Sequence, residues 1–312
     1  MTMNNKSFFG NLFQSRKGRL SGPFSDKVFG FFNSLFLILM FCIALYPIIF
    51  VLSASISSPA KVGTGQMLLW PVDVTWEGYK TLLSYTDLWV GYGNTVYYTV
   101  LGTTLNLLAT LPCAYALSRR DFNPRNIVMM FFMFTMFFGG GMIPGYLNVR
   151  DLGLVNTRFY ILIHGLISVS NMIVCRTFFA NSIPWEMQEA AMLDGATDFG
   201  VFTKIILPLS KPIIAVMSLY YGVGRWNTYF TSMMYIHDRD KYALQVVLRD
   251  ILSASRIDLS QIQDAESLAA IIGASDLVKY SLIVVATVPV LIVYPFVQKY
   301  FEKGVMIGSV KG

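Results

Sequence analysis

Long apolar stretches alternate with shorter polar segments along this chain, and the pattern predicts helices that cross a membrane. A transmembrane helix needs about 20 consecutive, predominantly apolar residues. The expected spans are residues 28–52, 92–117, 126–146, 159–179, 212–234 and 277–296. We therefore predict an all-α, polytopic membrane protein with six transmembrane helices. Its membrane domain would cover residues 28–300, between an N-terminal tail (1–27) and a C-terminal tail (301–312).

The composition agrees with a membrane protein, because 54% of the 312 residues are hydrophobic and only 13% are charged. Soluble domains carry about 25% charged residues. The net charge of +6 comes from basic residues that gather at the ends of the spans. That placement indicates topology, and it does not point to nucleic acid as a partner. Cys42, Cys113 and Cys175 lie inside apolar stretches, where we expect buried thiols rather than disulfides or metal ligands.

The basic residues also orient the chain. Cytosolic loops carry an excess of lysine and arginine, and such residues cluster in 1–27, at Arg119 and Arg120, and in the C-terminal tail. With six spans both ends lie on the same side, so we predict a multi-pass protein of the cell membrane with both termini in the cytosol. The first apolar stretch is too long for the core of a cleavable signal peptide.

A polar segment, residues 181–211, separates the fourth span from the fifth and falls on the cytosolic side. Pro184–Leu193 is expected to form a short helix that ends at Asp194 and Gly195, where glycine can take a left-handed cap. Thr197 would cap a second, amphipathic helix with an apolar face formed by Phe199, Phe202, Ile205, Ile206 and Leu209. This elbow of helices would lie along the membrane face. The alternative is an ordinary interfacial loop that covers the helix bundle.

The residues of this elbow resemble the cytoplasmic signature of the permease subunits of ATP-binding-cassette importers. The matching residues are Glu189, Ala190, Ala191, Asp194, Gly195, Ala196, Phe202, Leu207 and Pro208. Trp226-Asn227 and the final Gly308-Ser309-Val310-Lys311-Gly312 are similar to the sugar-importer branch that includes the inner-membrane subunits of the maltose transporter. The segment 138–144, which holds three consecutive glycines, resembles permeases assigned to complex or plant-derived oligosaccharides.

The resemblance implies a set of partners and a mechanism. Residues 184–208 would couple this chain to two cytosolic ATPase subunits, which would bind ATP and Mg²⁺, because this chain has no phosphate-binding G-x-x-x-x-G-K-[ST] motif and needs no cofactor itself. A second, related permease would complete the translocation path in the bilayer, although a homodimer is an alternative. Loop 236–276 would contact an extracellular solute-binding protein that delivers an oligosaccharide. Gly308, Lys311 and Gly312 would reach the ATPase interface.

Polar side chains in the fifth span are candidates for the substrate path. Arg225 is expensive to bury in a membrane and normally faces a cavity or a partner. We expect it either on the path of an acidic or heavily hydroxylated sugar, or in a structural contact with the second permease. Tyr220, Trp226, Asn227 and Tyr229 could offer rings and hydrogen bonds to a sugar, or could anchor the span at the interface.

Two other classes of function remain as alternatives. A stand-alone secondary transporter or channel for a small polar solute would need coupling carboxylates, and the predicted spans contain essentially no Asp or Glu. A membrane-embedded enzyme would need clustered catalytic or metal-binding side chains, and we expect none. Only the importer permease gives the polar segment 181–211 a task.

Overall fold

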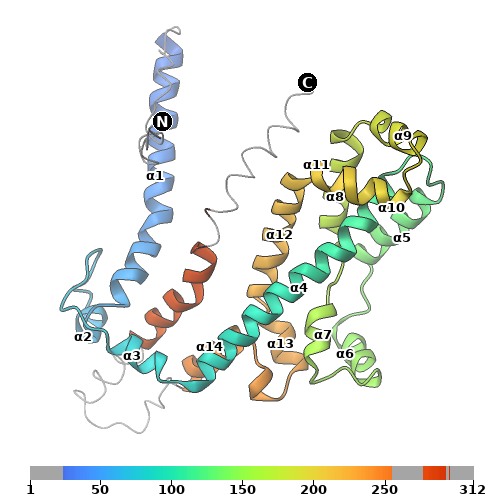
Figure 1. The fold of residues 1–312 in the computed structure, drawn as a ribbon. Helices are drawn as coiled ribbons and strands as arrows, with labels where there is room; N and C mark the ends of the chain where they lie inside the picture. The colour runs from blue at the N-terminus through green and yellow to red at the C-terminus, as the bar shows by residue number, and fades with distance from the viewer. Residues whose placement is uncertain (1–23, 255–276, 293–294, 296–312) are drawn as a thin grey trace, which may run out of the picture. The chain divides into compact units, whose positions relative to one another are not determined.

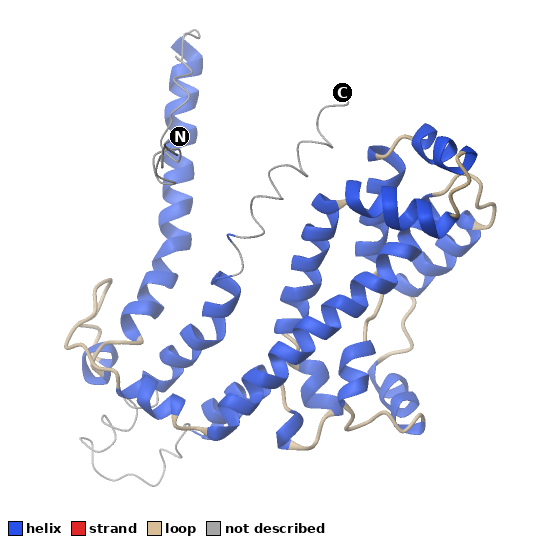
Figure 2. Cartoon of the chain, in the orientation of Figure 1, coloured by secondary structure: helices blue, strands red, loops and turns tan. Residues whose placement is uncertain are grey.

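The computed structural model describes residues 24–254, 277–292 and 295, and all regular secondary structure within those ranges is helical (Figures 1 and 2). The all-α prediction is therefore confirmed for the described residues. Two helices are long and apolar enough to cross a membrane alone, α1 (Phe24–Ala54) and α4 (Thr86–Ser118), and the number rises to four if each of two bent helix pairs is one span. Six spans remain a prediction.

Helix α1 up to Val51 forms one unit and the remaining residues form another. Most of the described side chains of this first unit are apolar and exposed. A helix that is hydrophobic on all sides is suited to lipid or to a packed partner. α1 thus matches the predicted first span, residues 28–52, and extends it at both ends.

Helix α4 is the centre of the second unit. It packs most extensively against α12 (Lys211–Trp226) and α8 (Val169–Ser182). Four of its polar side chains are buried: Asn94, Thr95, Asn106 and Thr110. The first two hydrogen-bond to residues 240–244, and the last two to residues of α12. Polar groups in a membrane helix find partners on other helices rather than in lipid, which explains why this span tolerates so many of them.

Two segments outside the predicted spans contain helices. Between the first two long helices lie α2 (Pro59–Gly63) and α3 (Glu77–Leu83). Segment 236–276 begins with a 3₁₀ turn, η2 (Arg239–Lys241), and continues as the amphipathic helix α14 (Leu244–Ala254). The predicted loop 236–276 therefore contains a helix in its described part; residues 255–276 lie outside the described ranges.

Helix α14 packs closely against the start of α4. A Cβ on Gly91 of α4 would lie 3.2 Å from the Cα of Leu244, so the absence of a side chain allows this approach. The apolar side of α14 joins a buried cluster with α3, α4 and the helix Leu277–Ile292. That last helix lies within the predicted sixth span, residues 277–296.

Three of the predicted spans are broken. The third consists of α5 (Arg125–Phe137) and α6 (Met142–Asp151), which meet at 112°. Gly139, Gly140 and Gly141 form the link, and Gly141 has a φ of +87° that favours glycine. Residues 126–146 therefore do not form one continuous helix, although the bent pair can still be one span.

The fourth and fifth predicted spans are also interrupted. α7 (Arg158–Ile163) stops before α8, and α12 stops before α13 (Phe230–Tyr235). Each break frees backbone groups that must find other partners in a membrane. Side chains from helices that are far away along the chain provide some of these hydrogen-bond partners.

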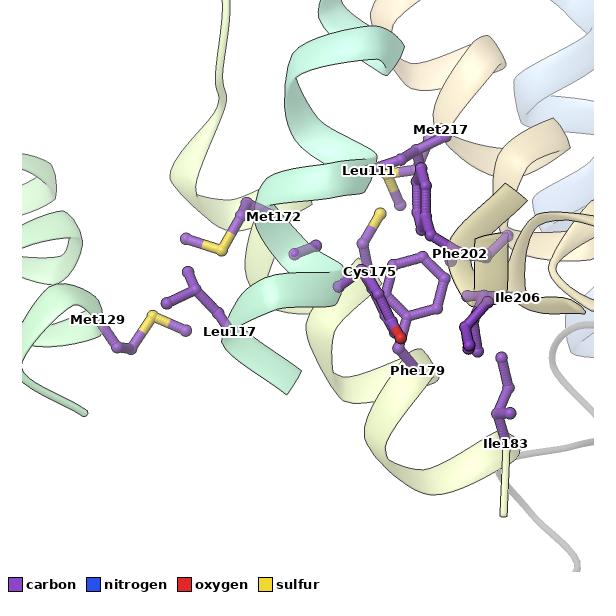
Figure 3. Packing of buried hydrophobic residues seen from close by; sticks show 14 of the residues in the cluster. Leu111, Leu117, Met129, Met172, Cys175, Phe179, Ile183, Phe202, Ile206 and Met217 are labelled. Atoms are coloured by element: carbon purple, nitrogen blue, oxygen red, sulfur yellow. The ribbon is translucent and has the colours of Figure 1, made fainter. Parts of the chain in front are cut away.

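A large apolar core lies at the end of α4 that precedes Arg119. Leu111 and Leu117 of α4 lie there in one buried cluster with Met172, Cys175 and Phe179 of α8 and with Met217 of α12 (Figure 3). Phe202 and Ile206 of the segment between α8 and α12 complete this core. The segment predicted as a cytosolic elbow is therefore packed into the end of the helix bundle.

Candidate functional site

The first limb of the elbow is α9 (Trp185–Leu193). It ends as predicted, with Gly195 in the left-handed conformation at a φ of +81°. The amide of Ala196 donates to the carbonyl of Ala191 at 2.9 Å, and that of Gly195 donates to the carbonyl of Met192 at 3.0 Å. This pair of bonds satisfies carbonyls at the helix end. Glycine is required because its backbone adopts this φ without steric cost.

The second limb departs from a regular helix. Thr197 caps α10 (Asp198–Val201), with its hydroxyl accepting from the amide of Gly200 at 3.1 Å, as predicted. A π-helical turn, Phe202–Ile206, follows, and then α11 (Leu207–Leu209). The wider turn changes which side chains share a face.

The prediction of one apolar face on this second limb was therefore wrong. Phe202 and Ile206 are buried, while Phe199 and Leu209 are exposed. The segment Asp198–Leu209 then meets α12 at 82°, so the limb crosses the end of the bundle before the chain enters the long helix (Figure 1).

The inner side of the elbow is fixed to the long helices. The ring of Tyr115 in α4 stacks on Phe202 with centroids 5.2 Å apart, and its hydroxyl donates to Oε1 of Gln188 at 3.1 Å. Gln188 and Ala191 are buried on α9. A polar side chain that is buried and hydrogen-bonded at such a joint fixes orientation as well as adding stability.

Arg119, the first residue after α4, connects the same helix to both limbs. Its guanidinium pairs with Asp121, and its Nη1 donates to Oδ1 of Asp198 in α10 at 2.7 Å. It also lies over the ring of Trp185 in α9, 5.8 Å from the centroid. We call Arg119, Asp121 and Asp198 the arginine clamp. The guanidinium lowers the pKa of the Asp121 carboxyl, and that carboxyl in turn raises the pKa of Arg119, so this pair is charged at neutral pH.

The outer side of the elbow is open. Leu193 is 89% exposed and Phe199 is 75% exposed. Glu189 is also exposed, and its Oε1 accepts a hydrogen bond from Nε1 of Trp185 at 2.5 Å. Glu189 and Leu193 are four residues apart on α9 and so share one face, which presents a carboxylate next to an exposed apolar side chain.

The signature residues divide between the two sides of the elbow. Ala191 and Phe202 are buried, and Ala196 and Leu207 are partly buried. The others are exposed: Glu189, Ala190, Asp194, Gly195 and Pro208. The signature thus combines residues that fix the elbow to the bundle with residues available to a partner.

A second feature is a cavity of about 340 Å³ at the breaks in the fourth and fifth predicted spans. Four of the candidate path residues line it: Tyr220, Arg225, Asn227 and Tyr229. Its other polar lining residues are Asn106, His164, Ser168, Asn171, Tyr221, Thr228 and Thr231. Such a lining of amides, hydroxyls and aromatic rings can bind hydroxylated ligands by hydrogen bonds and ring contacts.

Trp226 is not among the residues that line this cavity. Its Nε1 donates to the carbonyl of Ala286 at 3.1 Å, and its ring lies 6.1 Å from that of Tyr92. Its side chain therefore joins α12 to α4 and to the helix Leu277–Ile292. Of the five path candidates, Trp226 is therefore the one that packs between helices and does not line the cavity.

Arg225 is braced inside the chain. Its Nε donates to Oδ1 of Asn106 at 2.9 Å, and its two Nη atoms donate to the carbonyls of Ile161 and Leu162 at 2.5 and 3.0 Å. Asn106 in turn donates to the carbonyls of Gly165 and Leu166 at 3.0 and 2.7 Å. Arg225 and Asn106 thus satisfy the carbonyls that the end of α7 leaves free.

Several residues that build these sites were not singled out from the sequence. No role was predicted for Asn106 or for the other polar residues of the second span. Arg119 was used only for orientation, and Asp198 was not considered. A lone polar or charged residue beside a span gives no signal of its distant partner.

Gly308, Lys311 and Gly312, the predicted ATPase-interface tail, lie outside the described residues. No cluster of potential metal ligands occurs within the described ranges.

Comparison with known proteins identifies the family. Residues 85–307 match the model of the family described as "Binding-protein-dependent transport system inner membrane component". The chain belongs to this family, whose members are transport permease subunits of the cell membrane. The resemblance to importer permeases is thereby confirmed.

Two relatives from Bacillus subtilis (strain 168) match over nearly their whole length. The chain is 39% identical to the polygalacturonan/rhamnogalacturonan transport system permease protein YtcP, over 89% of this chain and 96% of that protein. It is 37% identical to Protein LplC, over 92% and 96%. A solved structure of a bacterial ABC transporter involved in the import of the acidic polysaccharide alginate contains a similar chain. It has 38% identity and a TM-score of 0.79, with 90% of this chain and 99% of that chain covered.

Proposed function

We propose that this chain is one membrane subunit of an ATP-driven importer for oligosaccharides. It would form the translocation path with a second, related permease, and two cytosolic ATPase subunits that bind ATP and Mg²⁺ would drive the cycle. An extracellular solute-binding protein would deliver the sugar. Family membership and the names of the relatives support this assembly, with both termini and the elbow in the cytosol.

The observation that carries the proposal is the two-sided construction of the elbow at residues 184–208. Its inner side is fixed to α4, α8 and α12 through the core around Phe202 and through the arginine clamp. Its outer side exposes Leu193 beside Glu189. A segment that is rigidly joined to several long helices can pass a push from an external protein to those helices, because packed cores shift as units rather than deform.

The cavity beside Arg225 and Asn227 supports the second half of the proposal. It lies where two predicted spans are broken, and in membrane proteins such breaks are tolerated where they line a cavity or are buried in protein. In the importer, this cavity would be this subunit's share of the sugar path, and the second permease would supply the rest.

Affinity purification of the tagged chain from its native membranes, followed by mass spectrometry, tests the coupling role. We expect the wild type to retain an ATPase and a second permease. Glu189→Lys should lower ATPase recovery at least tenfold, because it reverses the charge of an exposed carboxylate one helical turn from Leu193, while recovery of the second permease persists.

Glu77→Lys is the matched control, since Glu77 is also an exposed acid early in a helix but lies in α3. It should leave ATPase recovery unchanged. If the chain purifies alone, or if both variants behave alike, the coupling role is wrong and a stand-alone transporter becomes the better account.

A further inference from the structure

Arg225 carries a positive charge that no acidic side chain of the described residues neutralises. Arg225 is only 8% exposed. The acceptors of its hydrogen bonds are the Asn106 amide and two backbone carbonyls, and all three are uncharged. Within the described ranges no Asp or Glu forms an ion pair with it, and the lining of the adjacent cavity contains no acid. Buried charges in proteins are normally paired.

The guanidinium also has donors left over. Arginine has five N–H groups in a planar fork, and three are used in the bonds to Asn106, Ile161 and Leu162. The two remaining N–H groups are one on each Nη atom, and Arg225 lines the cavity. Guanidinium N–H groups donate strong, charge-assisted hydrogen bonds to carboxylates.

Bracing α7 does not by itself require a net charge. The carbonyls of Ile161 and Leu162 lie at the end of α7, and such dipoles offset part of a nearby positive charge. They cannot cancel it, and a membrane environment makes the remainder costly. A neutral amide could donate to the same carbonyls without that cost. The retained charge therefore indicates a ligand that is itself negative.

We propose that the cavity selects oligosaccharides that carry carboxylates, such as chains of uronic acids, and that Arg225 is the specificity-determining residue. This inference rests on the proposed import function and adds the charge of the substrate. The uncharged groups of the same cavity, including Asn171, Tyr220 and Asn227, would bind hydroxyls and sugar rings whether or not carboxylates are present.

The test uses the complete importer, with its partners and binding protein, reconstituted in vesicles that contain ATP and Mg²⁺. Import is compared for trimers of galacturonate and of mannuronate and for the same trimers with their carboxylates reduced to alcohols. We expect the wild type to import at least one acidic trimer at least tenfold faster than its reduced form. Arg225→Gln should lower that ratio at least tenfold, mainly through slower import of the acidic trimer.

Asn227→Ala is the matched variant for a neutral residue of the same cavity, and it should slow both forms by a similar factor and leave the ratio unchanged. The same binding protein serves every variant, so its own preference cancels from the comparison. A wild type that imports reduced trimers as fast as acidic ones overturns the inference. This comparison needs only the wild type, so it can be made even if Arg225→Gln does not assemble. An unchanged ratio in Arg225→Gln also overturns it. If ATP-dependent import of every sugar is absent, the proposed function itself fails.

Discussion

Arg119→Met is expected to lower the amount of sugar imported per ATP hydrolysed by roughly thirtyfold while the ATPase subunits remain bound. The arginine clamp joins the end of α4 to α9 and α10 through Asp198 and the ring of Trp185. Charge-assisted hydrogen bonds of this kind contribute about 2 kcal/mol, and a loss of that size changes an equilibrium roughly thirtyfold. The elbow should then separate from the bundle more often, so that ATP is hydrolysed without moving the helices.

The import-to-hydrolysis ratio in reconstituted vesicles, together with hydrogen exchange of residues 185–206, measures this effect. Arg120→Met is the matched control, because Arg120 is the adjacent, exposed arginine. Asp198→Asn should give a smaller loss, since Arg119 still lies over the ring of Trp185 in α9. A ratio and an exchange rate in Arg119→Met equal to those of Arg120→Met would show that the clamp does not transmit motion.

Asn106→Leu is expected to destabilise the subunit by about 3 kcal/mol or more. The substitution has a similar volume but removes the acceptor of Arg225 and both donors to the carbonyls of Gly165 and Leu166. Each buried group left without a partner costs about 1–3 kcal/mol, and a charged group costs more. The break between α7 and α8 should loosen, and the yield of assembled importer should fall.

Thermal unfolding of the purified complex in detergent measures this loss. Asn171→Leu is the control, because it makes the same change at a partly buried position in the wall of the same cavity. It should leave the midpoint of unfolding within a few degrees of the wild type. If Asn106→Leu unfolds at the same temperature as Asn171→Leu, the braced break is not a significant source of stability.

Local features were predictable from the sequence because their causes lie within a few residues. Glycine at Gly195 takes the left-handed turn that ends α9, and Thr197 caps the next helix through an amide three residues away. Each of these depends on intrinsic preferences that a short window of sequence contains.

Features that depend on distant partners could not be predicted in this way. The break between α7 and α8 lies in a stretch that is apolar on both sides, and it is satisfied by Asn106 and Arg225 from two other helices. The arginine clamp joins residues 79 positions apart. Hydropathy sets the length of a span, but it does not show where a side chain from elsewhere makes a break possible.

Helix α14 is a different case, because its signal was present. Leu244, Val247, Leu248 and Ile251 recur at the spacing of one helical face and are buried together. The acidic and basic residues around them led to the interpretation of a polar loop. A search for helical periodicity within charged segments would have found this helix.

The central claim is that the chain carries oligosaccharide across the membrane under the control of ATP hydrolysed by partner subunits. The most direct measurement is uptake of labelled oligosaccharide into vesicles that contain this chain, its second permease and the ATPases, with the binding protein outside. The account predicts uptake that requires both ATP within reach of the ATPases and the binding protein, and that is lost when either is omitted. Uptake by vesicles that contain this chain alone, driven by an ion gradient and indifferent to ATP, would contradict it.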